Sequence, residues 1–184
     1  MSATDQRALI DDLPGDLMMW VLIVSELLVF GAGMLAFLAV RITDPAGFAE
    51  AQSHLHRTAA GINTLVLVTS GWLAALAVRD AEAGALPRLR WRLVLAAGLG
   101  AVFLWLKAGE YADLARAGLS FDSHPFFTFH LLLTGFHAAH VAAGMILLLI
   151  VALPATPRAT EAGAAFWHMV DLVWVLLFPV VYLI

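Results

Sequence analysis

The sequence predicts an all-α polytopic membrane protein built as a bundle of five transmembrane helices. Hydrophobic residues make up 62% of the 184 residues and charged residues only 13%, whereas soluble domains have about 25% charged residues. The excess is gathered into long apolar segments, each close to the roughly 20 residues that a spanning helix needs. We therefore expect one compact membrane domain and no separate soluble domain.

The five segments follow one another with short connectors. The expected spans lie at about 17–40, 59–78, 91–109, 125–152 and 163–184. Helix-breaking residues separate them, namely Asp44-Pro45 with Gly47, Gly84 with Pro87, Gly118 through Pro125, and Pro154 with Pro157. Residues 1–16 are polar and acidic and lack the basic-then-apolar order of a signal peptide, so we expect a polar N-terminal leader before a retained first helix.

Charge and composition exclude several functional classes and suggest an orientation. The chain has no stripe of basic residues that would indicate nucleic-acid binding. The absence of cysteine excludes disulfides and thiolate metal sites. The basic residues form two sets, Arg7, Arg79, Arg88, Arg90, Arg92 and Arg158 on the N-terminal side, and Arg41, Arg57, Lys107 and Arg116 on the other side. The larger first set favours a cytoplasmic N-terminus.

The fourth segment carries a polar face within an apolar span. On a helix, one narrow face holds His130, Thr134, His137, Val141 and Gly144, with His140 on its flank. Imidazoles have little reason to contact lipid tails, so this face should contact other helices. The small residues nearby would let a partner backbone approach closely.

Glu26 is the acidic residue expected deepest in the first span. At about 1.5 Å per helical residue, Glu26 and His140 come to the same level near the middle of the bilayer. An isolated carboxylate is costly there, so Glu26 is protonated, paired or beside a water cavity. We predict that Glu26 faces His140, with His137 as the second choice. A structural polar clamp, proton handling and a lipid-headgroup contact are the open roles.

Further polar residues fall toward the other ends of the spans. Asn63 is expected to open the second span, Glu110 to close the third and His130 to begin the fourth, as interfacial caps. Lys107 stands three residues before Glu110 and either pairs with it on one helix face or extends to the interface.

The fifth segment combines aromatic and ionisable residues. His168 and Asp171 are three residues apart, and Trp167 and Trp174 flank them. Two tryptophans at this spacing are typical of bundle or interface anchors. A contact with a lipid phosphate or with a partner subunit is the second interpretation of the His168–Asp171 pair.

Metal or haem chemistry has no specific motif in this chain. A zinc site would draw on His137 and His140, but no HExxH accompanies them. The four histidines of the last two spans leave a bis-histidine haem b open, namely His130, His137, His140 and His168. We expect no metal and no intrinsic cofactor. An independent haem b cytochrome and a small proton-coupled transporter remain the alternatives.

Five separated motifs run through the chain in order. They are Trp20, Ser25-Glu26 and Phe30; Asn63-Thr64 and Ser70-Gly71; Glu110-Tyr111; Thr134-Gly135-Phe136-His137, His140-Val141 and Gly144; and Glu161, Trp167-His168, Val170-Asp171 and Val173-Trp174. Their order and spacing resemble subunit III of the haem–copper oxidase superfamily over essentially the whole chain after the leader. This resemblance implies an accessory subunit without a redox centre that binds beside the catalytic subunit of a respiratory complex in the bacterial inner membrane.

The resemblance also implies roles for single residues and a bound lipid. Glu26 matches the family's carbodiimide-reactive intramembrane carboxylate, and the other buried polar positions of the family are matched by His137, His140, His168 and Asp171. The chain resembles a short form that lacks the first two of seven helices, where a cleft holds phospholipid. Lys107 departs from the family, which often has glutamine at this position.

Within the family, two stretches resemble the version that accompanies bacterial nitric oxide reductase. They are the leader Leu13-Pro14-Gly15-Asp16 and the connector Pro45-Ala46-Gly47-Phe48. That resemblance implies a nitric oxide reductase partner and a role in denitrification. Quinol oxidases and cytochrome c oxidases are the rival partners.

Overall fold

The computed structural model describes residues 17–184, and every regular element in that range is helical. The order is α2 (Leu17–Thr43), α3 (Pro45–Ser53), α4 (Arg57–Glu82), α5 (Leu86–Arg116), α6 (Pro125–Val151), α7 (Pro157–Phe178) and a short π-helix, η1 (Pro179–Leu183). Among the described residues, five helices are long and apolar enough to cross a membrane: α2, α4, α5, α6, and α7 continued by η1. The predicted all-α fold with five candidate spans is confirmed, while the leader at 1–16 lies outside the described residues.

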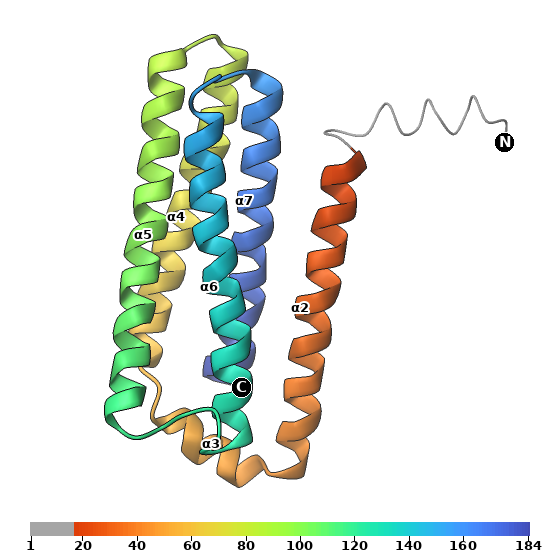
Figure 1. Ribbon diagram of the computed structural model, residues 1–184, viewed down its shortest axis with the longest axis vertical. Coiled ribbons are helices and arrows are strands. Elements are labelled where there is room, and N and C mark those ends of the chain that lie inside the picture. The colour runs from red at the N-terminus through yellow and green to blue at the C-terminus, as the bar shows by residue number, and fades with distance from the viewer. Residues whose placement is uncertain (1–16) are drawn as a thin grey trace, which may run out of the picture.

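The spans α4, α5, α6 and α7 form an antiparallel four-helix bundle, and α2 lies beside it (Figure 1). α2 contacts α6 and α7, and the gap between α2 and the bundle is widest at the N-terminal end of α2. Only 17% of the most apolar window of α2 is buried inside the protein, compared with 50% for the last span. α2 is therefore the peripheral helix of the fold.

Three helices begin in the same way, with a proline in the first turn and a polar cap before it. Asp44 accepts a hydrogen bond from the Gly47 amide at the start of α3. His124 caps α6 and Thr156 caps α7 in the same manner. Proline suits this position because its missing N–H would have had no partner inside the helix.

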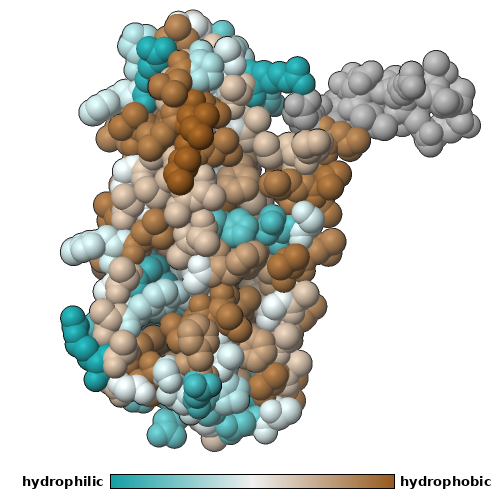
Figure 2. All heavy atoms as spheres, viewed as in Figure 1, coloured by the Kyte–Doolittle hydropathy of each residue, from teal (hydrophilic) through white to brown (hydrophobic). Residues whose placement is uncertain are grey.

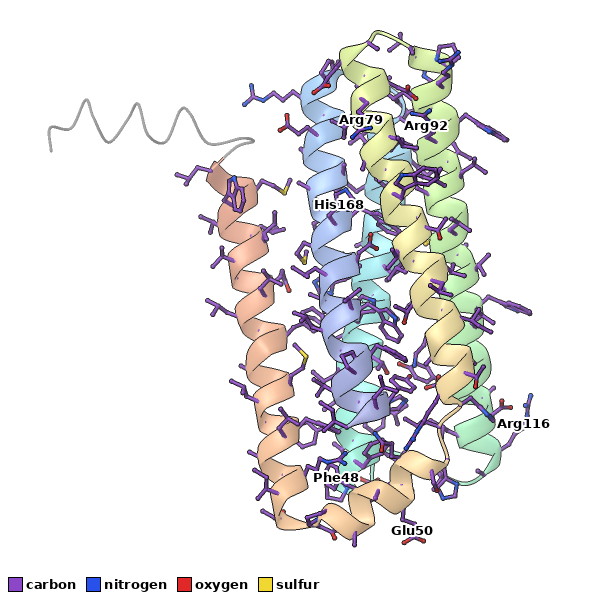
Figure 3. All side chains as sticks on the ribbon, turned by 180° about the vertical axis from the view of Figure 1, so that it is seen from behind. Phe48, Glu50, Arg79, Arg92, Arg116 and His168 are labelled. Carbon is purple, nitrogen blue, oxygen red and sulfur yellow. The ribbon has the colours of Figure 1, made fainter. Side chains whose placement is uncertain are left out.

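The connector after α2 differs from the sequence expectation because it contains a helix of its own. α3 crosses one end of the bundle, with Phe48 directed into the protein and Glu50 directed outward (Figure 3). α4 and α5 are also longer than the apolar segments at 59–78 and 91–109. Charged residues extend these helices into the polar region, where hydropathy no longer marks them but backbone hydrogen bonding continues.

The centre of the bundle is organised around Trp167 of α7. A Cβ added at Gly144 of α6 would lie 2.6 Å from the indole ring, and one added at Gly100 of α5 would lie 2.8 Å from it. These glycines therefore make room for a large aromatic side chain. The sequence led us to expect a close backbone approach at Gly144, and an indole ring takes that space instead.

Candidate functional site

Glu26 and His140 meet at mid-height between α2 and α6. Glu26 Oε2 lies 3.2 Å from His140 Nε2, and the two side chains are 25% and 15% exposed. Figure 2 shows a hydrophilic patch among apolar atoms at this level of the molecule. The predicted contact is therefore present with His140, and the second choice, His137, is not the partner.

The other ring nitrogen of His140 limits what this pair can do. His140 Nδ1 lies 2.9 Å from the Phe136 carbonyl oxygen, to which it can only donate. In the neutral ring, Nε2 is then an acceptor, and a protonated Glu26 is its natural donor. The same contact becomes an ion pair when the proton moves to Nε2. Glu26 and His140 can thus hold one proton between them.

The predicted polar face of α6 is buried along its whole length. Its residues His130, Thr134, His137, Val141 and Gly144 all lie inside the protein, while His140 is partly exposed on the flank. His137 has no hydrogen-bond partner on either ring nitrogen among the described residues. Its ring centroid lies 5.1 Å from that of Trp174 and 5.5 Å from that of Phe103. His137 is therefore enclosed by aromatic rings.

A second group of polar residues lies near the α3 end of the bundle, and we call Lys107, Glu110, His130 and Tyr182 the α3-end cluster. Glu110 Oε1 receives Lys107 Nζ at 2.9 Å and the Tyr182 hydroxyl at 2.8 Å. His130 Nε2 lies 3.0 Å from the same oxygen. Lys107 is only 2% exposed, so it pairs inside the protein and does not extend to the interface.

Aromatic rings surround the ammonium group of this cluster. Lys107 Nζ lies 4.9 Å from the ring centroid of Tyr111, 5.6 Å from that of Trp174 and 5.5 Å from that of Tyr182. These ring faces add to the carboxylate contact in stabilising the buried cation. Tyr182 was missed by sequence reasoning, because nothing in the pattern near the end of the last span singles it out.

Asn63 and Glu110 correct the expected positions of the helix ends. Both lie well inside their helices, because α4 begins at Arg57 and α5 ends at Arg116. Neither residue is an interfacial cap. Asn63 instead donates from Nδ2 to the Phe103 carbonyl oxygen at 3.2 Å, which links α4 to α5.

The two tryptophans of α7 attach this helix to α4. Trp167 Nε1 donates to Ser70 Oγ at 3.0 Å, and Trp174 Nε1 donates to Thr64 Oγ1 at 2.9 Å. Ser70 in turn links α4 to α5, because its hydroxyl donates to the Ala96 carbonyl oxygen at 2.7 Å. These contacts lie within the bundle, as the anchor interpretation requires.

His168 and Asp171 lie near each other on the α4 side of α7. His168 Nδ1 is 3.9 Å from Asp171 Oδ2, beyond hydrogen-bonding distance, and the imidazole is 46% exposed. A Cβ added at Gly71 of α4 would overlap the Asp171 carboxylate. Asp171 therefore packs against bare backbone, while the partly exposed His168 lies on α7 beside α4 (Figure 3).

The histidines do not converge on one centre. His130, His137 and His140 share α6 but have separate surroundings, and His168 lies beside Gly71 of α4. Within residues 17–184, no group of three or more histidine, aspartate and glutamate side chains is placed to hold a metal ion.

One further polar contact joins two connectors at the α3 end. His124 Nε2 lies 3.2 Å from Asp44 Oδ2, and His124 Nδ1 accepts from the Phe126 amide. With Nδ1 as an acceptor, the neutral imidazole carries its proton on Nε2 and donates it to Asp44. The hydrogen bond from the Gly47 amide lowers the pKa of the Asp44 carboxyl below its ordinary value, and the hydrogen bond from His124 adds a smaller effect in the same direction.

These observations define a class: a helical membrane protein with five candidate spans, whose buried ionisable side chains contact one another across the bundle. Residues 15–184 match the family model for cytochrome c oxidase subunit III. The chain belongs to the cytochrome c oxidase subunit III family.

Individual relatives cover most of the chain. Cytochrome c oxidase subunit 3 of Corynebacterium diphtheriae is 33% identical, over 89% of this chain and 85% of the relative. The probable cytochrome c oxidase subunit 3 of Mycobacterium tuberculosis H37Rv is 32% identical, over 88% and 84%. Subunit 3 of the cytochrome bo(3) ubiquinol oxidase of Pseudomonas aeruginosa is 27% identical, over 89% and 82%. Membership of this family supports an accessory subunit of a haem–copper oxidase.

Proposed function

We propose that this chain is a non-catalytic accessory subunit of a bacterial respiratory complex, held beside a haem–copper catalytic subunit in the inner membrane. The observation that carries the proposal is the family match over residues 15–184. Glu26 pairs with His140, and Lys107 pairs with Glu110, inside the chain. These pairs support the proposal, because the ionisable side chains contact one another and so suit a structural role.

The proposed mechanism is mechanical and electrostatic. α2 exposes a long apolar face that includes Met18, Val21 and Leu28. This face suits a partner helix or a phospholipid, because it is broad, apolar and only loosely attached to the rest of the bundle. The Glu26–His140 pair lies at the edge of this face and buffers a proton beside the partner.

Nitric oxide reductase is the second candidate for the partner complex. The connector that begins with Pro45 favours it. In the structure this connector forms the first turn of α3. The motif at residues 13–16 lies outside the described residues. The relatives named above are oxidase subunits, so a terminal oxidase is the first candidate and a role in denitrification the second.

Purification of the tagged full chain in a gentle detergent tests the proposal. We expect a haem-containing catalytic subunit to co-elute, identified by mass spectrometry, and its Soret band to follow that subunit through further fractionation. Proton transport by the chain alone in liposomes would favour the transporter alternative. A Soret band in the chain after it is separated from every partner would favour the haem b cytochrome.

The role of Glu26 is tested separately by Glu26→Gln in the assembled complex. The amide keeps the shape of the side chain but cannot exchange a proton with His140. We expect unchanged assembly and faster loss of activity during turnover. Ser25→Ala is the matched control, because Ser25 is exposed on the same turn and bonds only to its own helix, at the Leu22 carbonyl oxygen. If Glu26→Gln and Ser25→Ala lost activity at the same rate, the proposed role of Glu26 in proton exchange would be contradicted.

A further inference from the structure

A cavity of about 360 Å³ lies between α4 and α5, toward the α3 end. It exists because the facing positions are small, including Ala59, Ala60, Ala108 and Gly109. A Cβ added at Gly109 would meet no atom within 4 Å. The volume falls in the range of small-molecule sites, roughly 300–1,000 Å³.

The most deeply buried polar side chain at this cavity, Asn63, has a hydrogen-bond acceptor that receives no donor from any described residue. The side chain of Asn63 is buried and lines the cavity. Its nitrogen is committed to the Phe103 carbonyl, which fixes the oxygen as the other end of the amide. Asn63 Oδ1 has no hydrogen-bond partner among the described residues. Buried polar atoms are normally satisfied, so this oxygen calls for a donor.

Glu110 adds a second hydrogen-bond acceptor to the lining of the cavity. The contacts of Glu110 with Lys107, His130 and Tyr182 all end on Oε1, while the same side chain lines the cavity. This arrangement leaves Oε2 as an acceptor for a ligand. Lys107 already balances the charge of Glu110. A neutral donor therefore fits better than a cation.

The same balance holds at the mouth of the cavity. Asp113 lines it and is paired with Arg116, whose Nη1 lies 2.6 Å from the carboxylate. His56 lines the mouth as well. The walls are apolar, and Trp105, which is 75% exposed, forms part of the lipid-facing rim. An apolar body can therefore leave the cavity past Trp105 into lipid.

We propose that this cavity binds the hydroxyl head of a lipid-soluble molecule, with the hydroxyl donating to Asn63 Oδ1 and Glu110 and the apolar body lying against Trp105. A quinol and a diacylglycerol share this chemistry. A quinone has the same body as its quinol but offers only acceptors, so at Asn63 Oδ1 and Glu110 acceptors would face acceptors, and the quinone would bind less tightly than the quinol. The donor requirement therefore gives the site a preference for the reduced form.

Native mass spectrometry of the full chain in nanodiscs tests the site with three probes: decylubiquinol under anaerobic reducing conditions, decylubiquinone, and dioctanoylglycerol. We expect one molecule of a hydroxyl-bearing probe to bind, at least about tenfold more tightly than the quinone. Strong binding of decylubiquinol alone identifies a quinol site, and strong binding of dioctanoylglycerol alone identifies a glyceride site. Binding of the quinone as tight as that of the hydroxyl probes, or no binding of either hydroxyl probe, would overturn the proposal.

Two variants locate the site. Gly109→Leu fills the cavity with a side chain that meets open space and improves helix propensity, so we expect at least a tenfold loss of affinity. Gly98→Leu is the matched control, because Gly98 lies on the same helix and also faces open space. Asn63→Val removes the unpartnered acceptor and should weaken the preference for quinol over quinone. Unchanged affinity in Gly109→Leu, or an unchanged preference in Asn63→Val, would contradict the assignment.

Discussion

At the residue scale, the α3-end cluster pairs a buried lysine with a carboxylate inside an apolar bundle. Glu110 balances the charge of Lys107, and Tyr182 bonds to both partners. A buried ion pair is weak evidence for stability as a whole, because removing two charges from water is costly. Removing one partner is a different matter, since the other charge then remains buried alone.

Lys107→Met is therefore expected to destabilise the fold by about 3–5 kcal/mol, since it leaves the Glu110 carboxylate without its cation. The double variant Lys107→Met with Glu110→Gln should recover much of this loss, because no net charge remains. Unfolding in mixed detergent micelles, followed by circular dichroism, measures both. Lys107→Gln is the control, since its amide still donates to Glu110 and should cost less than methionine. Additive losses in the double variant would contradict the coupling.

Sequence reasoning found some of these residue contacts and missed others for physical reasons. Glu26 and His140 were paired correctly, because helical rise alone places them at one depth. The pairing of Lys107 with Glu110 was one of two options left open, because a spacing of three residues puts them on one helix face but does not exclude extension to the interface. Tyr182 and the Asp44–His124 contact were missed, since both depend on how connectors and helix ends fold back. The periodicity of the sequence does not show how connectors and helix ends fold back onto the bundle.

At the element scale, the contact between α4 and α7 depends on two kinds of complementarity. Trp167 and Trp174 donate hydrogen bonds to hydroxyl groups of α4. Gly71 provides the bare backbone against which the Asp171 carboxylate packs. The first kind tolerates small shifts, whereas the second leaves no space for a methyl group.

Gly71→Ala should therefore destabilise the protein by about 1–3 kcal/mol, even though alanine favours helices more than glycine does. The added methyl group would overlap the Asp171 carboxylate, which would then have to leave its packed position against α4. Gly98→Ala is the matched control, because a Cβ there meets nothing within 4 Å, and it should be neutral or stabilising. The same unfolding measurement applies, and equal stabilities of the two variants would refute the packing argument.

The Asp44–His124 contact predicts an acid sensitivity at the α3 end. The pKa of Asp44 is lower in the folded protein than its ordinary value, so its contribution to stability is present above the unfolded pKa and is lost as the pH falls through the folded pKa. Between about pH 5 and pH 3, the wild type should lose more stability than Asp44→Asn, which keeps the helix cap but carries no charge.

Hydrogen exchange of α3 amides across this pH range measures the effect. Asp122→Asn is the control, because it removes a similar charge from the connector before α6, where the Asp122 side chain makes no hydrogen bond with a described residue. Its acid response should match that of the wild type. Parallel responses of Asp44→Asn and the wild type would show that the contact does not govern stability there.

At the scale of the whole molecule, hydropathy predicted the five spans, because length and apolarity suffice to mark them. It did not predict α3, whose mixed composition resembles a connector, or the ends of α4 and α5, which continue through charged residues. It also could not show that α2 is peripheral, since α2 is as apolar as the buried helices. That distinction depends on which faces find partners.

Orientation in the membrane is the whole-molecule property that the basic residues predict. With a cytoplasmic N-terminus, α3 lies on the periplasmic side and the α4–α5 turn on the cytoplasmic side. Figure 3 shows Arg79 and Arg92 at one end and Arg116 at the other. Because the chain has no cysteine, single exposed cysteines report each side cleanly. We expect an impermeant maleimide to label Ser53→Cys in intact spheroplasts and Ala83→Cys only after lysis, and the reverse pattern would invert the orientation.

The π-helical turn at the C-terminal end sets the direction in which the side chains of the last residues point. In η1 the Ile184 amide bonds to the Pro179 carbonyl, five residues earlier, so this turn accommodates more residues than an α-helical turn does. Deleting one residue here would rewind the turn and swing the following side chains about 100° around the axis, at 3.6 residues per turn. The phenol of Tyr182 would then point away from Lys107. Small length changes in this turn therefore act on the buried charge as directly as replacing the tyrosine does.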